Sequence, residues 1–370
     1  VAIDGKPIVR QAQLKHALGP RYAGETVRVE VERGKERKRL SFDVKLAATI
    51  EPYAHPFLGV LPETFSLEPS KNGILIRYVY PDSPAQQAGV KPGDRLIRIG
   101  DQPTPTLDRA LEALMAFEPG ATVSIEWRRG EAVGKARIKL AALPESVPND
   151  LPPRAKPGAT QDAEAPTGIV EVDIPEEPND CWALVPETYR AGIPHGVLIW
   201  LAHTDESWDE ASWKTTWGPV ARAHRLIVVA PQPAEEGRWS PTEAAFLEKI
   251  VDELARTYEI DRHRVVVGGR QSGAALAWIT AFRARQTFRG VVMLNGFPPR
   301  GGNLPANEPN QRLAVFLLQV PGSRLSRIGQ SMAEALRKAR YPVTERDVGG
   351  TFDEKTRRAV GEWIEVLPRF

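Results

Sequence analysis

The feature that most constrains this chain is a proline-rich stretch near its middle. Residues 143–180 contain eight prolines and no aromatic residue, and neither a helical nor a strand period runs through them. Because proline lacks an N–H group and fixes φ, this composition predicts an extended, semi-rigid linker. The 370 residues of the chain are also more than one hydrophobic core usually holds. The chain is therefore predicted to divide at residues 143–180.

The two sides of this predicted linker differ in their hydrophobic pattern. Upstream, apolar runs such as "ILIRYV" alternate with Gly, Pro and Asp turns around one helical pattern, which predicts small β-rich modules. Downstream, over residues 181–370, apolar strand-like runs alternate with amphipathic helices. That alternation predicts an α/β domain whose mostly parallel sheet is covered on both faces. The predicted fold class is thus multidomain, with β-rich modules followed by an α/β domain.

The composition points away from several kinds of partner. The 49 basic and 47 acidic residues nearly cancel, so no nucleic-acid partner is expected. Cys181 is the single cysteine, which excludes a disulfide within the chain and a multi-cysteine metal site. No ligand spacing for a metal or a cofactor is visible, and neither is expected. The longest apolar run, residues 313–320, is far shorter than the roughly 18 residues that span a bilayer, so no transmembrane segment is expected.

An internal duplication lies upstream of the linker. The segment that begins "VAIDGKPI" and ends "RKRLSFDVKLA" repeats the later segment that begins "IRIGDQP" and ends "GKARIKLA". Residues 1–48 therefore correspond to only the second half of a module. They are predicted to be a partial copy whose N-terminal half is missing from this sequence.

Residues 56–142 resemble a PDZ domain of the bacterial, HtrA-like kind. The resemblance lies in "PFLGV" (56–60), "GILIRYVYPDSPAQQAGVKPGDRLIRIGDQP" (73–103) and "TLDRALEAL" (106–114). It implies that a peptide adds to a sheet edge and that loop N–H groups capture its terminal carboxylate. The implied peptide-binding residues are Phe57, Leu58, Gly59, Val60, Leu107 and Leu111. Because the first groove position of the helix is Leu107, the implied partners are protein or peptide C-termini with apolar side chains; core packing explains Leu107 equally well.

Residues 181–370 resemble an α/β-hydrolase of the esterase or phospholipase/carboxylesterase type. The resemblance includes "CWALVPETY" (181–189), "HGVLIWLAHTDESW" (195–208) and "RTYEIDRHRVVVGGRQSGAALAW" (256–278). Such enzymes carry a nucleophilic serine on a turn written G-x-S-x-G. Here Gly269 and Gly273 occupy the flanks, and Gln271 stands in the serine position.

The rest of a catalytic triad is also missing from the sequence. Ser272 is the alternative nucleophile, but Arg270 then stands where the turn needs a small residue. The resemblance places the base at Thr351, and all six histidines precede Ser272, whereas a triad in this fold runs Ser, acid, His. The segment expected to supply the acid, residues 319–330, contains no carboxylate. The sequence therefore predicts a hydrolase fold without the hydrolase chemistry.

The resemblance also implies a remnant of the old active-site pocket, and the domain is expected either to serve as a scaffold or to bind a small ligand there. The resemblance places His203, Trp239, Arg270 and Gln271 at this pocket. His203 stands where the family commonly has His-Gly beside the oxyanion hole, and Trp239 lies in the loop-like segment "EEGRWSP". Packing is the alternative role for both side chains.

Three functions follow from these patterns. The leading hypothesis is a peptide-binding PDZ protein that carries an inactive α/β-hydrolase domain for scaffolding or ligand binding. The alternatives are an active serine esterase or peptidase that uses Ser272, and the regulatory C-terminal part of an HtrA-like serine protease whose protease domain lies upstream. The HtrA-like resemblance implies the bacterial periplasm or cell envelope.

Overall fold

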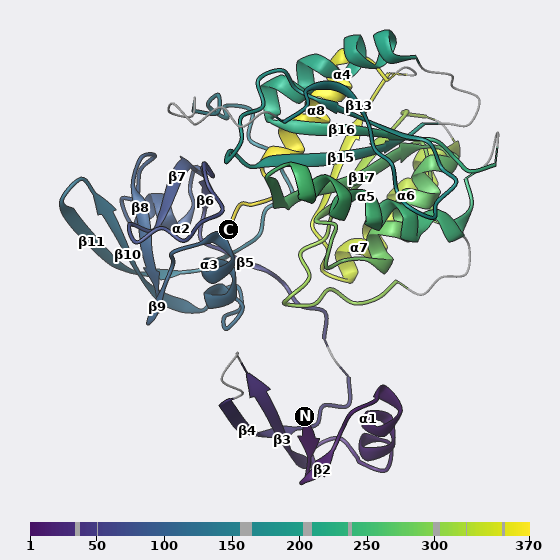
Figure 1. Ribbon diagram of the computed structural model, residues 1–370. Helices are drawn as coiled ribbons and strands as arrows, with labels where there is room; N and C mark the ends of the chain where they lie inside the picture. The colour runs from purple at the N-terminus through teal and green to yellow at the C-terminus, as the bar shows by residue number, and fades with distance from the viewer. Residues whose placement is uncertain are drawn as a thin grey trace. The chain divides into compact units, whose positions relative to one another are not determined.

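The computed structural model describes residues 1–33, 38–49, 51–155, 165–202, 209–235, 239–298, 304–322, 324–349 and 352–370. They form two compact units, Val1–Pro52 and Tyr53–Phe370 (Figure 1).

The first unit is a four-stranded sheet with one helix. Its strand order is β2-β1-β3-β4, and helix α1 (Gln11–Leu18) lies between β2 and β3 in the chain. The strands are β1 (Ala2–Ile3), β2 (Lys6–Pro7), β3 (Thr26–Arg33) and β4 (Lys38–Lys45). The second copy of the repeat has the same order, β9-β8-β10-β11, with helix α3 in the equivalent place. The shared topology agrees with the internal duplication, while the extent of the first module stays a prediction.

The predicted PDZ segment begins the second unit with a sheet of order β11-β10-β8-β7-β6, on which β9 pairs with β8. A short pair, β5 with β12, lies beside it. Its strands and helices are β5 (Pro56–Phe57), β6 (Val60–Pro62), β7 (Ile74–Val79), α2 (Pro84–Gln87), β8 (Arg95–Ile99), β9 (Gln102–Pro103), α3 (Leu107–Leu114), β10 (Thr122–Arg129), β11 (Ala132–Lys139) and β12 (Ala141–Ala142). Alternation along β10 buries Val123, Ile125 and Trp127, as a sheet with one solvated face requires.

An eight-stranded sheet organises the rest of the second unit, in the order β13-β14-β16-β15-β17-β18-β19-β20. β14 is antiparallel to both of its neighbours, and every other adjacent pair is parallel. The strands are β13 (Gly168–Glu171), β14 (Cys181–Val185), β15 (His195–Leu201), β16 (Leu226–Pro231), β17 (Ile260–Arg270), β18 (Gly290–Leu294), β19 (Ala314–Gln319) and β20 (Val343–Asp347).

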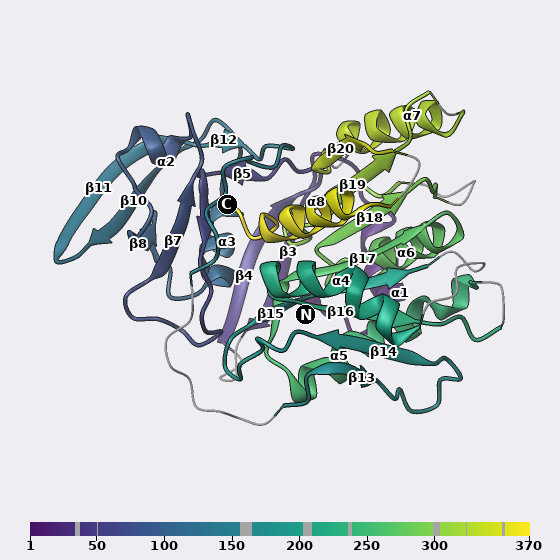
Figure 2. The same ribbon diagram turned by 90° about the horizontal axis from the view of Figure 1, so that it is seen from above.

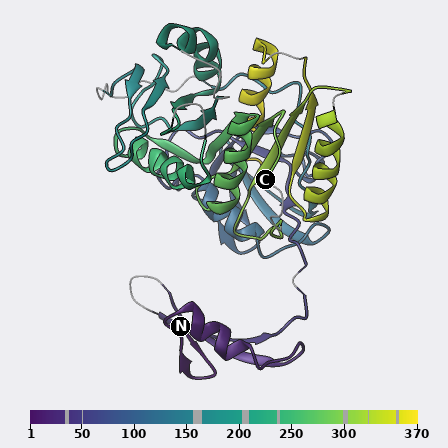
Figure 3. The ribbon, with the colours of Figure 1, turned by 90° about the vertical axis from the view of Figure 1, so that its right-hand side faces the viewer.

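Helices cover both faces of this sheet. Helices α4 and α8 share one apolar core with the sheet, and α5, α6 and α7 share the other. Figure 2 shows α4 and α8 side by side on one face, and the layers are seen from the side in Figure 3. The helices are α4 (Glu210–His224), α5 (Ala244–Thr257), α6 (Ser272–Arg283), α7 (Arg324–Lys338) and α8 (Glu354–Glu365), with a 3-10 turn, η1 (Pro241–Glu243), before α5. The predicted fold class is confirmed.

The described parts of the predicted linker lie against both the PDZ segment and the α/β domain; on the PDZ side, the Tyr78 hydroxyl donates to the Asp150 carboxylate over 2.7 Å. Strand β13 falls within residues 143–180 and forms the edge of the large sheet. Val172 and Ile174 are buried in the core that α5, α6 and α7 share. Further upstream, the Thr344 hydroxyl donates a hydrogen bond to the Glu145 carbonyl over 2.6 Å. A four-residue strand between prolines is too short to show a period, so the sequence did not predict it; the linker boundaries themselves stay a prediction.

None of the helices in the described ranges has both the length and the apolar composition needed to cross a membrane.

Candidate functional site

The turn between β5 and β6 presents two main-chain N–H groups to one oxygen atom. The N–H groups of Gly59 and Val60 donate to the main-chain oxygen of Phe370, over 2.9 and 3.0 Å. In return, the Phe370 N–H donates to the Val60 carbonyl over 3.0 Å. Gly59 has φ +103, and a Cβ there would lie 2.1 Å from the Cβ of Ser83, so only glycine fits this position.

The Phe370 side chain is buried in the core of the predicted PDZ segment. It belongs to one apolar cluster with Leu58 and Val60, and Leu107 and Leu111 pack against this cluster. Phe57 lies instead in a neighbouring cluster, where its ring meets Tyr80 edge-on at 5.0 Å. The structure thus gathers five of the six predicted peptide-binding residues around one cluster and places Phe57 beside it. Their role in binding a partner stays a prediction.

The turn between β17 and α6 is a strained elbow with Gln271 at its tip. Gln271 has φ +50 and ψ −110, a backbone conformation that non-glycine residues rarely adopt. A Cβ on Gly269 would lie 2.6 Å from the carbonyl carbon of Gly273, and one on Gly273 would lie 2.3 Å from the Leu201 oxygen. Strand and helix therefore approach too closely for side chains at either flank. Ser272 is the first residue of α6, one position beyond the tip.

The other predicted pocket residues have different surroundings. Gln271 and Ser272 are exposed and Arg270 is half-buried. Trp239 is buried in the α/β core, and its indole N–H donates to the Ala202 carbonyl over 3.0 Å, which fits the packing alternative. His203 and Thr351 lie outside the described residues. Within the described ranges, no histidine forms a hydrogen bond or ion pair with Gln271 or Ser272.

A buried charge cluster, which the sequence did not predict, joins the PDZ segment to the α/β domain. The Glu63 carboxylate lies 3.8 Å from Arg77, 3.0 Å from Arg154 and 3.4 Å from Arg225, measured between charged atoms. Arg77 also lies 2.9 Å from Glu365, and the His224 ring lies 3.1 Å from the same carboxylate.

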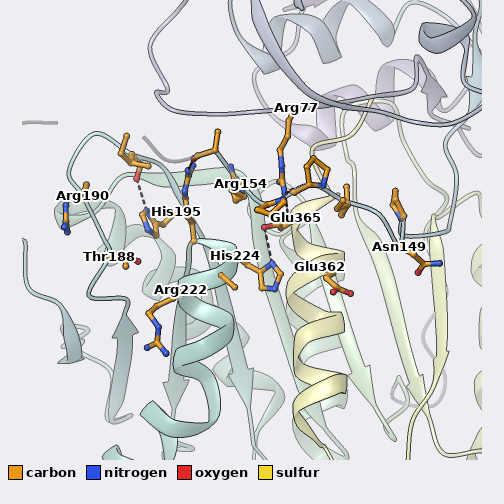
Figure 4. Close-up of a pocket in the computed structure, with 18 residues that line it drawn as sticks. Arg77, Asn149, Arg154, Thr188, Arg190, His195, Arg222, His224, Glu362 and Glu365 are labelled. Atoms are coloured by element: carbon orange, nitrogen blue, oxygen red, sulfur yellow. Dashed lines mark hydrogen bonds and ion pairs between the residues drawn. The ribbon is translucent and has the colours of Figure 1, made fainter. Parts of the chain in front are cut away.

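Arg77, Arg154, His224, Arg225 and Glu365 line a cavity of about 520 Å³, shown in Figure 4. Burial lowers the pKa of Arg225 to about 10, and the neighbouring Arg154 lowers it in the same direction. Burial raises the pKa of Glu365, but the hydrogen bond from His224 and the charge of Arg77 outweigh it and leave that pKa at about 2. The cluster's residues are far apart in sequence, so no local motif could have indicated it.

Comparison with known proteins finds a family match in the first half of the chain and two curated relatives that cover part of the chain. The PDZ domain family matches residues 58–140. The putative serine protease HhoB of Synechocystis sp. is 28% identical over 108 residues, covering 25% of this chain and 26% of that protein. A probable periplasmic serine endoprotease DegP-like protein of Pseudomonas putida is 27% identical over 157 residues, covering 38% of this chain and 33% of its own length. The chain thus spans a quarter to a third of the length of these curated relatives.

Solved structures are similar to just over half of the chain. A thermostable esterase superposes with a TM-score of 0.41 at 16% identity, covering 54% of this chain and 59% of its own. The S-formylglutathione hydrolase FrmB of Staphylococcus aureus has a TM-score of 0.41 at 13% identity, covering 56% of this chain and all of its own. Likeness at this level says nothing about chemistry, so the assignment of the second half relies on its sheet and elbow.

Together these observations define the class of both parts. Residues 58–140 are a PDZ domain with HtrA- and DegP-like homology. The part of the chain that follows has an α/β-hydrolase fold, in which a mostly parallel sheet presents an elbow between a central strand and a helix.

Proposed function

We propose that this protein binds peptides through its PDZ groove and that its α/β-hydrolase domain is a scaffold without hydrolase activity. The observation that carries the proposal is the convergence of the Gly59 and Val60 N–H groups on one main-chain oxygen. Two donors that meet at one point, next to an apolar cluster, suit a terminal carboxylate and the side chain that accompanies it.

The proposed partners are protein or peptide C-termini that end in an apolar residue. Leu58, Leu107 and Leu111 offer no hydrogen-bonding side chain to the cluster. A polar side chain buried there would therefore lose its hydrogen bonds to water without replacement. The main-chain contacts are independent of ligand sequence, so selectivity is proposed to come from the apolar cluster.

The elbow supports the proposal that the α/β domain has no hydrolase activity. The residue at its strained tip is Gln271, and an amide does not act as a nucleophile in acyl transfer. Ser272 begins the helix, one residue past the tip, and no histidine in the described ranges is bonded to it. The domain is proposed to serve as a scaffold, with any small-ligand binding confined to the old pocket near Gln271.

We also propose a cellular compartment for the protein and an association with a protease. Both curated relatives are named as serine proteases, and one is named as periplasmic. By analogy, this chain is proposed to work in the bacterial periplasm or envelope, alongside a protease domain or its substrates.

Two experiments test the proposed function. A library of free-carboxylate peptides that differ in their last residue should bind with a preference for apolar residues, and amidated versions should bind much less; no binding, or no preference, overturns the peptide-binding half. A fluorophosphonate probe should leave the intact mass of the protein unchanged. Labelling of the native protein that Ser272→Ala abolishes and Gln271→Ser retains would establish an active, shifted nucleophile instead.

A further inference from the structure

We infer that the resident occupant of the PDZ groove is the chain's own Phe370, which residues 366–369 connect to the α/β domain, and that partner peptides bind only in competition with it. The inference rests on the proposed peptide-binding function and concerns the regulation of that site. Figures 1 and 2 both place the C-terminal end of the chain beside α3 and the β5 region of the PDZ domain.

Phe370 pairs through its main chain with Val60, at the edge of the sheet. Phe370 and Val60 exchange both of their main-chain hydrogen bonds, which is the pattern of a hydrogen-bonded pair in an antiparallel ladder. The Gly59 N–H contributes a third bond to the same residue. These bonds are those by which a peptide would be recruited to a sheet edge, here made within one chain.

The side chain of Phe370 also fills the apolar part of the groove. It is completely buried, and it belongs to the hydrophobic core of the PDZ domain, which includes Leu58 and Val60 and against which Leu107 and Leu111 pack. Burial of an aromatic side chain of this size is strongly favourable because it removes a large apolar area from water. A partner that uses the same cluster must therefore first remove Phe370.

Arg369, the residue before Phe370, is also fixed in place by hydrogen bonds. Arg369 is buried, and its guanidinium donates to the carbonyls of Val366 and Pro144, each over 2.8 Å. Arg312 donates in turn to the Arg369 carbonyl, also over 2.8 Å. The segment is thus bound on both sides, by the PDZ loop and by the α/β domain.

The antiparallel register leaves one weak point in this self-association. The next hydrogen-bonded pair of the ladder would join position 62 to position 368, and both are prolines, which have no N–H to donate. The pairing with β6 is therefore limited to one residue pair. A partner with another residue at the equivalent of position 368 could donate one hydrogen bond to the Pro62 carbonyl, which the chain's own segment cannot make.

The short connection between α8 and Phe370 compensates for the small number of hydrogen bonds in this pairing. Helix α8 ends at Glu365, and the buried side chains of Trp363 and Ile364 anchor it to the sheet. Only the four residues 366–369 then separate the helix from Phe370. A tether this short holds its ligand at an effective concentration on the order of millimolar or higher. A free peptide that binds the empty groove with micromolar affinity is therefore expected to lose at least tenfold in apparent affinity.

The experiment compares the full chain with Phe370→Ala, using a labelled Val-Leu-Pro-Arg-Phe peptide with a free carboxylate as the probe. Leu367→Ala is the matched control, because Leu367 packs on the α/β core rather than in the groove. A chain that ends at Leu367 provides a second way to empty the groove. Anisotropy titrations should show at least tenfold tighter binding to Phe370→Ala and to the shortened chain, and no gain for Leu367→Ala.

Amide hydrogen exchange supplies a readout independent of the probe. The Gly59 and Val60 amides should exchange faster when Phe370 is replaced, while the Ile125 amide in β10 stays protected and shows that the domain remains folded. Unchanged protection at Gly59 and Val60 would overturn the inference even if the probe bound more tightly.

The remaining outcomes distinguish the hypothesis of peptide binding from the hypothesis that Phe370 of the same chain occupies the groove. Equal affinity for the native chain and both variants overturns self-occupancy but leaves peptide binding intact. Absence of binding to every form overturns both, since the emptied groove must accept the same residues offered in trans. Probe affinity that weakens as the native chain is concentrated would mean that the tail of a second copy fills the groove, which also overturns occupancy within one chain.

Discussion

Arg77 and Glu365 form an ion pair although 288 positions separate them in the sequence, with the guanidinium Nη2 2.9 Å from the carboxylate Oε2. Arg77 lies on β7 of the PDZ domain, and Glu365 is the last residue of α8. Both side chains are almost inaccessible, at 6% and 5% exposed. The pair therefore ties the PDZ domain to the helix from which the groove-filling segment departs.

Replacing Arg77 by methionine should destabilise the second unit by about 3–5 kcal/mol, because Glu63 and Glu365 would stay buried with one cation fewer. Guanidinium-induced unfolding measures the change. Lys135→Ala is the matched control: its ion pair with Glu126 is exposed, so the loss should be at most about 1 kcal/mol. Similar small losses in both variants would show that the buried pair adds little.

The Glu365 carboxylate should make the protein sensitive to acid. Its folded pKa of about 2 lies below its ordinary value of 4.5, so the unfolded chain takes up the proton first as the pH falls. The associated stability, about 3 kcal/mol, is complete above pH 4.5 and is lost as the pH falls towards 2. Unfolding at pH 5, 4 and 3 should show a smaller decline for Glu365→Gln than for the native protein; an identical decline would contradict the assignment.

His195 should contribute a second acid-sensitive step at higher pH. Burial lowers the pKa of its imidazole from 6.5 to about 3, with nearby arginines acting in the same direction. Between pH 6.5 and 3 the unfolded state therefore binds more protons than the folded state. The free energy of unfolding consequently decreases as the pH is lowered. From pH 6.5 to 5 this amounts to about 2 kcal/mol. His195→Gln should remove that part of the decline in unfolding titrations, whereas His16→Gln, which replaces an exposed side chain, should not.

The elbow flank at Gly269 should not accept a side chain. A Cβ there would lie 2.6 Å from the main chain at Gly273, so Gly269→Ala must push β17 and α6 apart. The expected loss is about 1–3 kcal/mol in thermal or denaturant unfolding. Gly349→Ala, with no atom within 4 Å of the added Cβ, should change stability by less than about 0.5 kcal/mol. A neutral Gly269→Ala would mean that the elbow is looser than described.

Cys181 should report unfolding of the α/β domain. Its thiol is buried on β14, and burial raises its pKa well above the usual range, so the reactive thiolate is scarce. A thiol-specific reagent should label the native protein very slowly and the denatured protein fully. Rapid labelling under native conditions would show that β14, next to the edge of the sheet, opens readily.

Local sequence patterns predicted most of the fold and part of the candidate site. The PDZ and hydrolase assignments rested on contiguous motifs, since loops, strands and turns are dictated by neighbours in sequence. The spacing of Gly269 and Gly273 in the sequence is enough to indicate that Gln271 stands at the tip of the elbow. By contrast, β13 was missed because four residues are too few to display a strand period.

The identity of the residue at the elbow, the absence of a histidine after it and the order of the domains were determined by the sequence alone, because they depend on residue types at fixed local spacings. Only the tertiary structure decided that Arg77 meets Glu365 and that Phe370 lies against Gly59 and Val60. These contacts join residues some 300 positions apart, and their energy comes from burial and charge pairing that arise only after the sheets have packed.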